Sequence, residues 1–253
     1  MWIFETKLFS LKIFKNLKDY TIIYKGYEEI CENTLALYFD SKDSGYSFEA
    51  GQYAYFSVTN SKFKDEKGNS RPFSFASSPL IKDKIMIAVR NNSSVFIKNL
   101  TELPAGAEVF LSKPAGGLAF SGDHSLPAVF ISGGTGITPA RSIIESSFLS
   151  RSSQRIYLFY SNKSESLAAF LGDFRTWSET SDNFSFIPLI EDTTNVKWNS
   201  EFGIIDETIL KKYLNDLVNY RFYLTGPETM VASVKNILSE NKVLPENIQT
   251  ENF

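Results

Sequence analysis

The first half of the chain consists of short apolar runs separated by turn residues. Several short strands at such spacing are typical of an antiparallel barrel or sandwich. Residues 62–70 are polar and contain glycine, so they predict a surface loop, and residues 94–103 can form the one helix of this half. The predicted strands cover residues 21–24, 34–39, 53–58, 71–76, 85–89 and 108–111.

From residue 127 onward, predicted strands alternate with predicted helices. Repeated strand–helix units indicate a parallel sheet flanked by helices. We therefore predict a two-domain β plus α/β protein, in which an antiparallel β-barrel is followed by a five-stranded parallel α/β domain. The predicted division is an N-terminal extension over 1–20, the barrel over 21–122 and the α/β domain over 123–253. The strands are expected near residues 128–131, 156–160, 184–190, 221–225 and 248–251, and the later helices near 166–177, 206–217 and 228–238.

A glycine-rich turn joins the first strand of the second half to its helix. Gly133-Gly134-Thr135-Gly136 follows the apolar run directly, and Thr138 and Pro139 suit the N-cap and first position of a helix. Backbone N–H groups in such a turn can approach an anion closely, and the helix N-terminus points at it. The spacing matches neither the G-x-G-x-x-G fingerprint nor the P-loop. A diphosphate site is the favoured interpretation, and a plain tight turn is the alternative.

Two other segments, 160–163 and 225–228, also follow predicted strands of this half. Ligands of open parallel sheets bind beyond the carboxyl ends of the strands, so the convergence of these segments favours the diphosphate site. Ser161 and Lys163 suit a ribose or its 2′-phosphate, although a lysine on a loop is often simply solvated.

In the first half, Arg71-Pro72-Phe73-Ser74 places a guanidinium near a strand edge. Arginine suits bidentate phosphate contact, and Phe73 can lie against a planar ring. Alone, this tetrapeptide also fits an ordinary strand. Glu251 and Phe253 fit either a frayed end or an aromatic ring placed to cover a ligand.

The amino-acid composition limits the kinds of site that this chain can form. The 253 residues include 43% hydrophobic and 22% charged residues, with a formal net charge of -3, which indicates a globular protein and argues against nucleic-acid binding. Cys31 is the only cysteine and His124 the only histidine. One cysteine and one histidine are too few, within this chain, for a disulfide framework, a Cys-ligated iron–sulfur cluster, a Cys/His zinc site or bis-His haem ligation. We expect no metal site, so redox chemistry needs an organic cofactor or an external partner.

The sequence predicts no transmembrane segment, because it lacks a run of about 18 apolar residues. Residues 1–20 mix apolar side chains with lysines and lack the compact apolar segment of a signal peptide. We interpret them as an element covering the protein's own surface, with peripheral membrane contact or packing on a partner as alternatives. The expected location is cytoplasmic.

Several motifs, in the right order, resemble those of the ferredoxin–NADP reductase superfamily over residues 20–253. Arg71-Pro72-Phe73-Ser74 resembles its Arg-x-Tyr-Ser flavin motif, with Phe73 at the Tyr position. The segment 133–139 is similar to its pyridine-nucleotide pyrophosphate motif. The segment 225–230 resembles its Cys-Gly-Pro-x-x-Met motif, with Thr225 in place of Cys. The turns at 51–53 and 114–117 and the acidic-aromatic ending 250–253 also fit.

This resemblance implies an FAD-binding barrel and an NAD(P)-binding α/β domain, with FAD and either NADPH or NADH as cofactors. By that reading Arg71 contacts the flavin diphosphate, Phe73 stacks on the ring system, Ser74 lies near flavin N5 and Phe253 covers the other face. The implied FAD-binding residues are Arg71, Pro72, Phe73, Ser74, Val89, Arg90, Ser94, Val95 and Phe253. The implied NAD(P)-binding residues are Gly133, Gly134, Thr135, Gly136, Thr138, Ser161, Lys163, Thr225, Gly226, Pro227 and Met230. The implied catalytic residues are Ser74, Thr225, Glu251 and Phe253.

The expected function is a flavin-dependent oxidoreductase that passes a hydride from NAD(P)H to FAD and then electrons to an external acceptor, such as a ferredoxin or flavodoxin. The acceptor is taken as external because a fused plant-type cluster needs four cysteines. Phe73 lacks the hydroxyl that could bond the ribityl chain, and Thr225 makes the positioning of nicotinamide less favourable. These departures and the N-terminal segment keep one alternative open, a nucleotide-binding subunit or sensor that has lost turnover. A reductase that treats flavin as a substrate is a further alternative.

Overall fold

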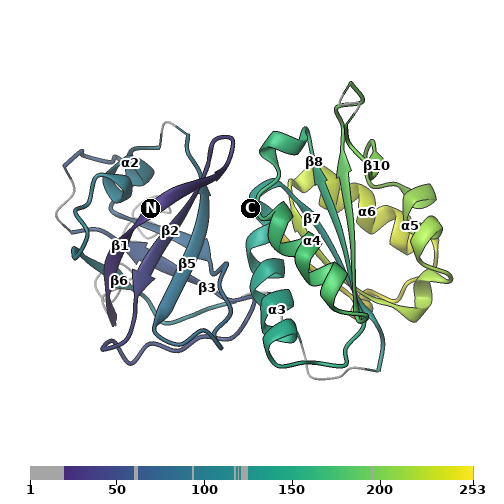
Figure 1. Ribbon diagram of the computed structural model, residues 1–253, viewed down its shortest axis with the longest axis horizontal. Coiled ribbons are helices and arrows are strands. Elements are labelled where there is room, and N and C mark those ends of the chain that lie inside the picture. Colours follow the sequence, from purple (N-terminus) through teal and green to yellow (C-terminus); the bar gives the residue numbers. More distant parts are fainter. Residues whose placement is uncertain are drawn as a thin grey trace, which may run out of the picture.

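The computed structural model describes residues 20–59, 62–92, 94–116, 118, 120, 125–194 and 197–252. Two sheets lie side by side, and helix α3 (Ile137–Leu149) runs along the face of the second sheet that is turned toward the first (Figure 1). The predicted N-terminal extension, except Tyr20, and Phe253 lie outside the described residues.

The first sheet is antiparallel and curls into a barrel that does not close. Its strands lie in the order β4-β3-β6-β1-β2-β5, and a bridge joins Phe75, directly after β4, to Ile87 of the other edge strand β5. Alternate residues such as Ile22 and Tyr24 point into one aromatic-rich core, as the two-residue period of a strand requires. The strands are β1 (Tyr20–Cys31), β2 (Thr34–Asp40), β3 (Tyr53–Ser57), β4 (Ser70–Ser74), β5 (Lys84–Arg90) and β6 (Glu108–Leu111), with helix α2 (Val95–Thr101) after β5.

The second sheet is parallel, with the strand order β10-β9-β8-β7-β11-β12. The five predicted strands are present, and the two-residue strand β10 adds a sixth at one edge. Every residue of β7 is buried, as expected for a strand covered on both faces. The strands are β7 (Ala128–Gly133), β8 (Ile156–Asn162), β9 (Phe184–Ile190), β10 (Glu201–Phe202), β11 (Arg221–Gly226) and β12 (Ile248–Asn252).

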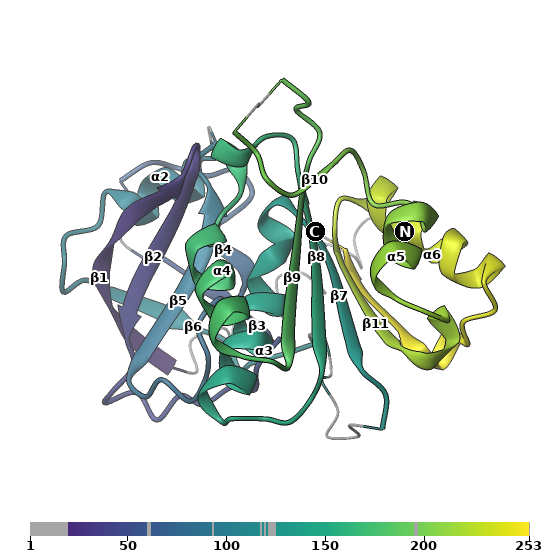
Figure 2. The same cartoon turned by 45° about the vertical axis from the view of Figure 1, so that its right-hand side comes forward.

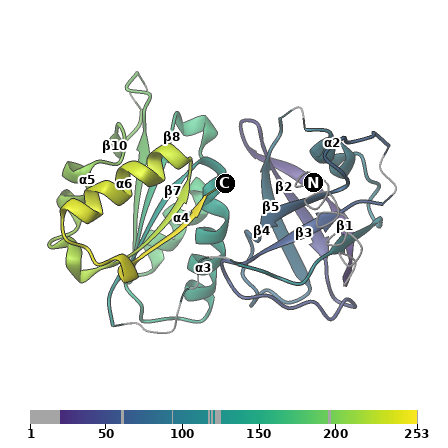
Figure 3. The ribbon, with the colours of Figure 1, turned by 180° about the vertical axis from the view of Figure 1, so that it is seen from behind.

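Helices α3 and α4 (Leu171–Thr180) cover one face of this sheet, and α5 (Glu207–Tyr213) and α6 (Glu228–Glu240) cover the other (Figures 2 and 3). Each pair of helices packs on the sheet through its own apolar core. Phe174 of α4 belongs to the core beneath α3 and α4, and Val234 of α6 belongs to the core beneath α5 and α6. The short 3₁₀ turns are η2 (Gly134–Gly136), η3 (Glu165–Leu167), η4 (Leu217–Asn219) and η5 (Pro245–Asn247).

Two helix starts differ from the predictions. The glycine turn forms η2, and α3 then begins at Ile137, so Thr138 is not the N-cap; its hydroxyl instead donates to the carbonyl of Thr135 at 3.1 Å. Helix α4 begins at Leu171 rather than near residue 166. Phe170 adopts a left-handed backbone conformation, with φ of 63°, and this separates η3 from α4.

Gly136 lies where η2 crosses the end of β11. A Cβ added there would come within 2.7 Å of the nitrogen and Cα of Gly226. Backbone therefore packs on backbone at this point, and only glycine fits. The contact brings the glycine turn and the segment after β11 together, as their positions at neighbouring strand ends predicted.

We expect Gly136→Ala to lower the free energy of unfolding by about 1–3 kcal/mol, because the added methyl group meets backbone atoms that cannot rotate away. Denaturant unfolding measures this change. The matched control is Gly172→Ala in α4, where a Cβ meets nothing within 4 Å. This control should be neutral or stabilising by about 0.5–1 kcal/mol. Equal stability of Gly136→Ala and the unaltered protein would contradict the packing.

Candidate functional site

Two cavities meet between the barrel and the parallel sheet. The larger of the two, the barrel cavity, has a volume of about 730 Å³ and is lined by Ser74, Arg90 and Thr135, among others. The other, the sheet cavity, has about 520 Å³ and is lined by Arg90, Gly134 and Lys163, among others. Because Arg90 lines both, and Gly134 and Thr135 are neighbours in η2, the two cavities share a wall.

The barrel cavity lies where the first sheet fails to close. Its wall includes residues from both edge strands, Arg71 to Ser74 of β4 and Ala88 to Arg90 of β5. Ten residues of the sequence predictions line this cavity: Arg71, Pro72, Phe73, Ser74, Val89, Arg90, Ser94, Thr135, Thr138 and Glu251. Thr135 and Thr138, which the resemblance assigned to the nucleotide, thus face the cavity on the flavin side.

Two polar atoms in this cavity are buried without a hydrogen-bond partner: Ser74 Oγ and Glu251 Oε2. Ser74 is only 4% exposed. Burial also raises the pKa of the Glu251 carboxyl to about 7. Since buried polar groups in folded proteins are nearly all satisfied, this pair indicates a cavity built to receive a polar ligand.

The Arg71 guanidinium already has several partners. Its Nη1 donates to the carbonyls of Lys67, Gly68 and Ser70, and its Nη2 pairs with Asp65 at 2.6 Å. The loop that was predicted at 62–70 therefore folds back onto the arginine of the flavin-like motif. A phosphate in the barrel cavity would have to share or displace the Asp65 carboxylate.

Aromatic side chains form much of the remaining wall. Phe73 packs against Phe56 and Phe96, with ring centroids 5.8 and 5.9 Å away. Tyr53 and Tyr55, to which the sequence analysis gave no binding role, also line the cavity. They alternate along β3 opposite Ser74 and Pro72, so the two-residue period together with strand pairing could have found them.

The sheet cavity collects residues from the carboxyl ends of β7, β8 and β11. Six of the predicted nucleotide-binding residues line it: Gly133, Gly134, Ser161, Lys163, Pro227 and Met230. Buried Tyr160 holds the glycine turn in place, because its hydroxyl donates to the Gly134 carbonyl at 3.2 Å and accepts from the Ala169 amide at 3.1 Å. Burial raises the pKa of this phenol, so it remains a donor.

Four predicted residues with described side-chain or backbone positions line neither cavity: Val95, Gly136, Thr225 and Gly226. Thr225 is fully buried, and its hydroxyl pairs with that of Ser132 at 2.8 Å. Thr225 nevertheless lies in register with Glu251 on β12. Phe253 lies outside the described residues.

A third cavity, of about 830 Å³, lies elsewhere between the two sheets and is lined by Arg141, Asp173 and Tyr38, among others. Polar groups of its wall pair with one another: the buried Arg141 bonds Asp173, and Tyr38 donates to Glu28. We therefore place the candidate site at the two smaller cavities, because the barrel cavity holds buried polar atoms that lack partners and the sheet cavity shares a wall with it. Over the described ranges, no group of three or more metal-ligating side chains occurs, and no helix is both long and apolar enough to cross a bilayer.

Residues 130–236 match the family described as the oxidoreductase NAD-binding domain. The fold matches that of ferredoxin–NADP⁺ reductase from Plasmodium falciparum, with a TM-score of 0.74 and 15% identity, over 92% of this chain and 95% of that one. The matched domain and the shared fold agree with the resemblance to the ferredoxin–NADP reductases.

The chain is 26% identical to a reductase component of terephthalate 1,2-dioxygenase from Comamonas, over 81% of this chain and 59% of that protein. It therefore spans less than two thirds of that relative. It is also 25% identical to a probable flavin reductase from Aliivibrio fischeri, over 83% of this chain and 87% of that protein.

The raised pKa of Glu251 predicts a specific pH dependence of stability. The carboxyl titrates at about 7 in the folded protein, against 4.5 for an ordinary glutamate. Between these values the folded protein retains a proton that the unfolded chain has lost, so stability falls as the pH rises through this window. We expect the stability of Glu251→Gln to fall less than that of the unaltered protein as the pH rises through this window, because glutamine has no proton to lose. Urea unfolding from acidic to mildly alkaline pH measures it, and parallel curves for the two proteins would contradict the assignment.

Proposed function

We propose that this protein is a flavin-dependent oxidoreductase that passes electrons from NAD(P)H through FAD to an external acceptor, such as a ferredoxin or flavodoxin, in the cytoplasm. The observation that carries the proposal is the wall that the two cavities share at Arg90 and η2. Two ligands in these cavities would lie next to each other, which electron transfer between them requires. The corresponding division is a flavin-binding unit over 21–122 and a nucleotide-binding unit over 123–253.

The barrel cavity fits a flavin. When bound, this cofactor supplies the redox chemistry, taking up a hydride and releasing electrons singly. Ser74 Oγ and Glu251 Oε2 would find in it the partners that they lack, and Arg71 and Arg90 would face its negative charge. Because the Glu251 carboxyl has a pKa of about 7, it can hold or give up a proton there at neutral pH.

The sheet cavity fits a nicotinamide nucleotide. Gly134, where an added Cβ would meet only Arg90 Nη2 at 3.5 Å, leaves room for a diphosphate beside the backbone of the turn. Ser161 and Lys163 line the same cavity and suit a ribose or its 2′-phosphate. Glu191 lines the same cavity and opposes a 2′-phosphate, so the choice between NADPH and NADH depends on which of these side chains faces the ribose. The roles implied for Thr225, Val95 and Phe253 stay predictions.

Anaerobic stopped-flow mixing with NADPH and with NADH tests this function. We expect at least one nucleotide to bleach the visible absorbance of flavin bound to the protein. Ser74→Ala should slow the bleaching about tenfold, the equivalent of one lost hydrogen bond. The control is Ser57→Ala, a buried barrel serine that lines neither cavity, which should leave the rate unchanged. Failure of both nucleotides to reduce the flavin would rule out the oxidoreductase and favour a binding subunit or sensor.

A free-flavin reductase is the second candidate, and two observations favour it. The Aliivibrio relative is described as a probable flavin reductase and is matched over 87% of its length. In addition, the Arg71–Asp65 ion pair occupies the guanidinium that a diphosphate would need, which would weaken the binding of FAD more than that of riboflavin. Turnover of free flavins with little tightly bound FAD would distinguish this candidate.

We expect Asp65→Asn to tighten FAD binding several-fold, up to about tenfold, because it frees Arg71 and removes a carboxylate near the diphosphate. Riboflavin, which lacks phosphate, should bind equally to both proteins. Fluorescence titration measures both affinities. The matched control is Glu102→Gln, which breaks the Lys62–Glu102 pair of the same loop without touching Arg71. Weaker FAD binding in Asp65→Asn, or an equal change for the two flavins, would refute the competition.

A further inference from the structure

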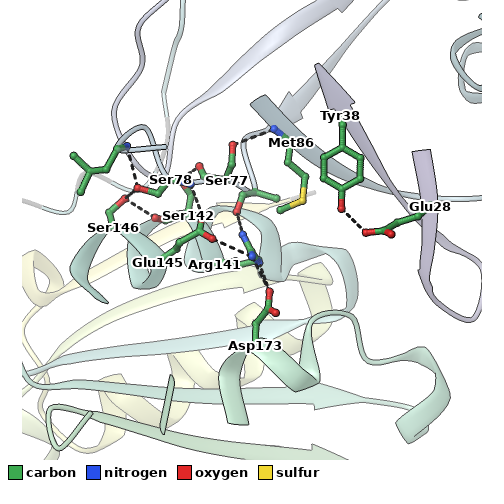
Figure 4. A network of polar contacts seen from close by, with 12 residues as sticks. Glu28, Tyr38, Ser77, Ser78, Met86, Arg141, Ser142, Glu145, Ser146 and Asp173 are labelled. Atoms are coloured by element: carbon green, nitrogen blue, oxygen red, sulfur yellow. Dashed lines mark hydrogen bonds and ion pairs between the residues drawn. The ribbon is translucent and has the colours of Figure 1, made fainter. Parts of the chain in front are cut away.

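One face of helix α3 is bonded to the barrel at three successive backbone positions (Figure 4). Arg141 Nη1 donates to the carbonyl of Ala76 at 2.7 Å, and Ser142 Oγ donates to the carbonyl of Ser77 at 2.7 Å. Glu145 Oε2 accepts from the amide of Ser78 at 2.5 Å. We call the segment 76–78 together with these three side chains the α3 clamp.

The clamp is buried and its charges are satisfied. Arg141 and Glu145 are 6% and 8% exposed, and Ser142 is fully buried. Arg141 Nη2 lies 3.1 Å from Glu145 Oε1 and 2.7 Å from Asp173 Oδ2, and its guanidinium lies over the ring of Phe170. Removing one partner from such a network leaves a charge buried without compensation, so the groups hold a single arrangement.

The two segments that the clamp joins are each close in sequence to residues that line one of the two cavities. On the barrel side, Ala76 is two residues beyond Ser74, which lines the barrel cavity. On the sheet side, Arg141 lies in the second turn of α3, which begins directly after η2, where Gly134 lines the sheet cavity. A helix is stiff over such a length, so the contacts at the clamp determine how far the glycine turn stands from Ser74.

We propose that Arg141, Ser142 and Glu145 are positioning residues for the reaction between the two cavities: they fix the separation of the flavin-side and nucleotide-side walls. This inference rests on the proposed oxidoreductase function. None of the three side chains lines either cavity, so they are not catalytic residues. Their effect follows from geometry, because a displacement of about 1 Å between reacting groups can cost on the order of a hundredfold in rate.

The test separates positioning from binding and from folding. The variants are Glu145→Ala, which removes the acceptor of the Ser78 amide, Glu145→Gln, which keeps an oxygen for it, and Ser142→Ala, which removes one contact. The control is Ser147→Ala on the same helix, since the Ser147 hydroxyl takes no part in the clamp. The readouts are the single-turnover rate of flavin reduction, the affinities for flavin and NAD(P)H, and amide hydrogen exchange of the protein without added flavin.

We expect Glu145→Ala to reduce the single-turnover rate at least tenfold while both affinities change less than twofold, by the geometric argument above. Hydrogen exchange should rise in the peptide that covers 75–78 and not in the other barrel strands. Glu145→Gln should recover much of the rate, and Ser147→Ala should match the unaltered protein. If Glu145→Ala does not fold, Ser142→Ala tests the proposal in its place, and we expect it to lower the single-turnover rate by a smaller factor.

Three outcomes would overturn the inference: an unchanged rate in folded clamp variants, a loss of affinity that accounts for the loss of rate, or exchange that rises throughout the barrel, as a purely structural role would cause. If the unaltered protein does not reduce flavin at all, the proposed function fails instead. The exchange measurement then still shows whether the clamp holds the 75–78 segment.

Discussion

The buried guanidinium of Arg141 joins the two halves of the molecule. Arginine cannot give up its charge in a protein, so its burial requires the two carboxylates, the Ala76 carbonyl and the aromatic rings that surround it. These partners come from the barrel, from α3 and from α4. The orientation of α3 along the barrel, and with it the place of the glycine turn at its start, rests on the contacts of this charge together with those of Ser142 and Glu145.

The local structure of the chain was largely predictable. The change from short apolar runs to alternating strand and helix patterns placed the barrel and the parallel sheet, and the rule that ligands bind beyond strand ends brought Gly133, Ser161 and Pro227 to one cavity. The start of α3 was predicted wrongly because glycines that form a 3₁₀ turn leave Thr138 inside the first helical turn. The residue pattern of a capped helix does not distinguish these two arrangements.

What depends on packing between distant segments could not be predicted. Arg90 ends an ordinary barrel strand, and nothing in its sequence neighbourhood shows that it lines both cavities. Asp65 lies in a loop whose composition indicates only exposure, yet it pairs with Arg71. Arg141, Ser142 and Glu145 fit a helix of any orientation, and only the folded structure shows which face carries them and that this face is buried. The sequence therefore located the walls of the site but not what holds them together.

The barrel remains open between β4 and β5 except at one bridge, and the wall of the barrel cavity is made by these two edges. An open edge presents main-chain N–H and C=O groups to whatever lies beside it, and side-chain substitutions other than proline leave those groups in place. The main-chain part of this wall is therefore less sensitive to substitution than the side chains of Arg71, Ser74 and Glu251 that also line it. An edge built this way can keep its main-chain course while its side chains change, and the fold is indeed shared with the Plasmodium reductase at 15% identity.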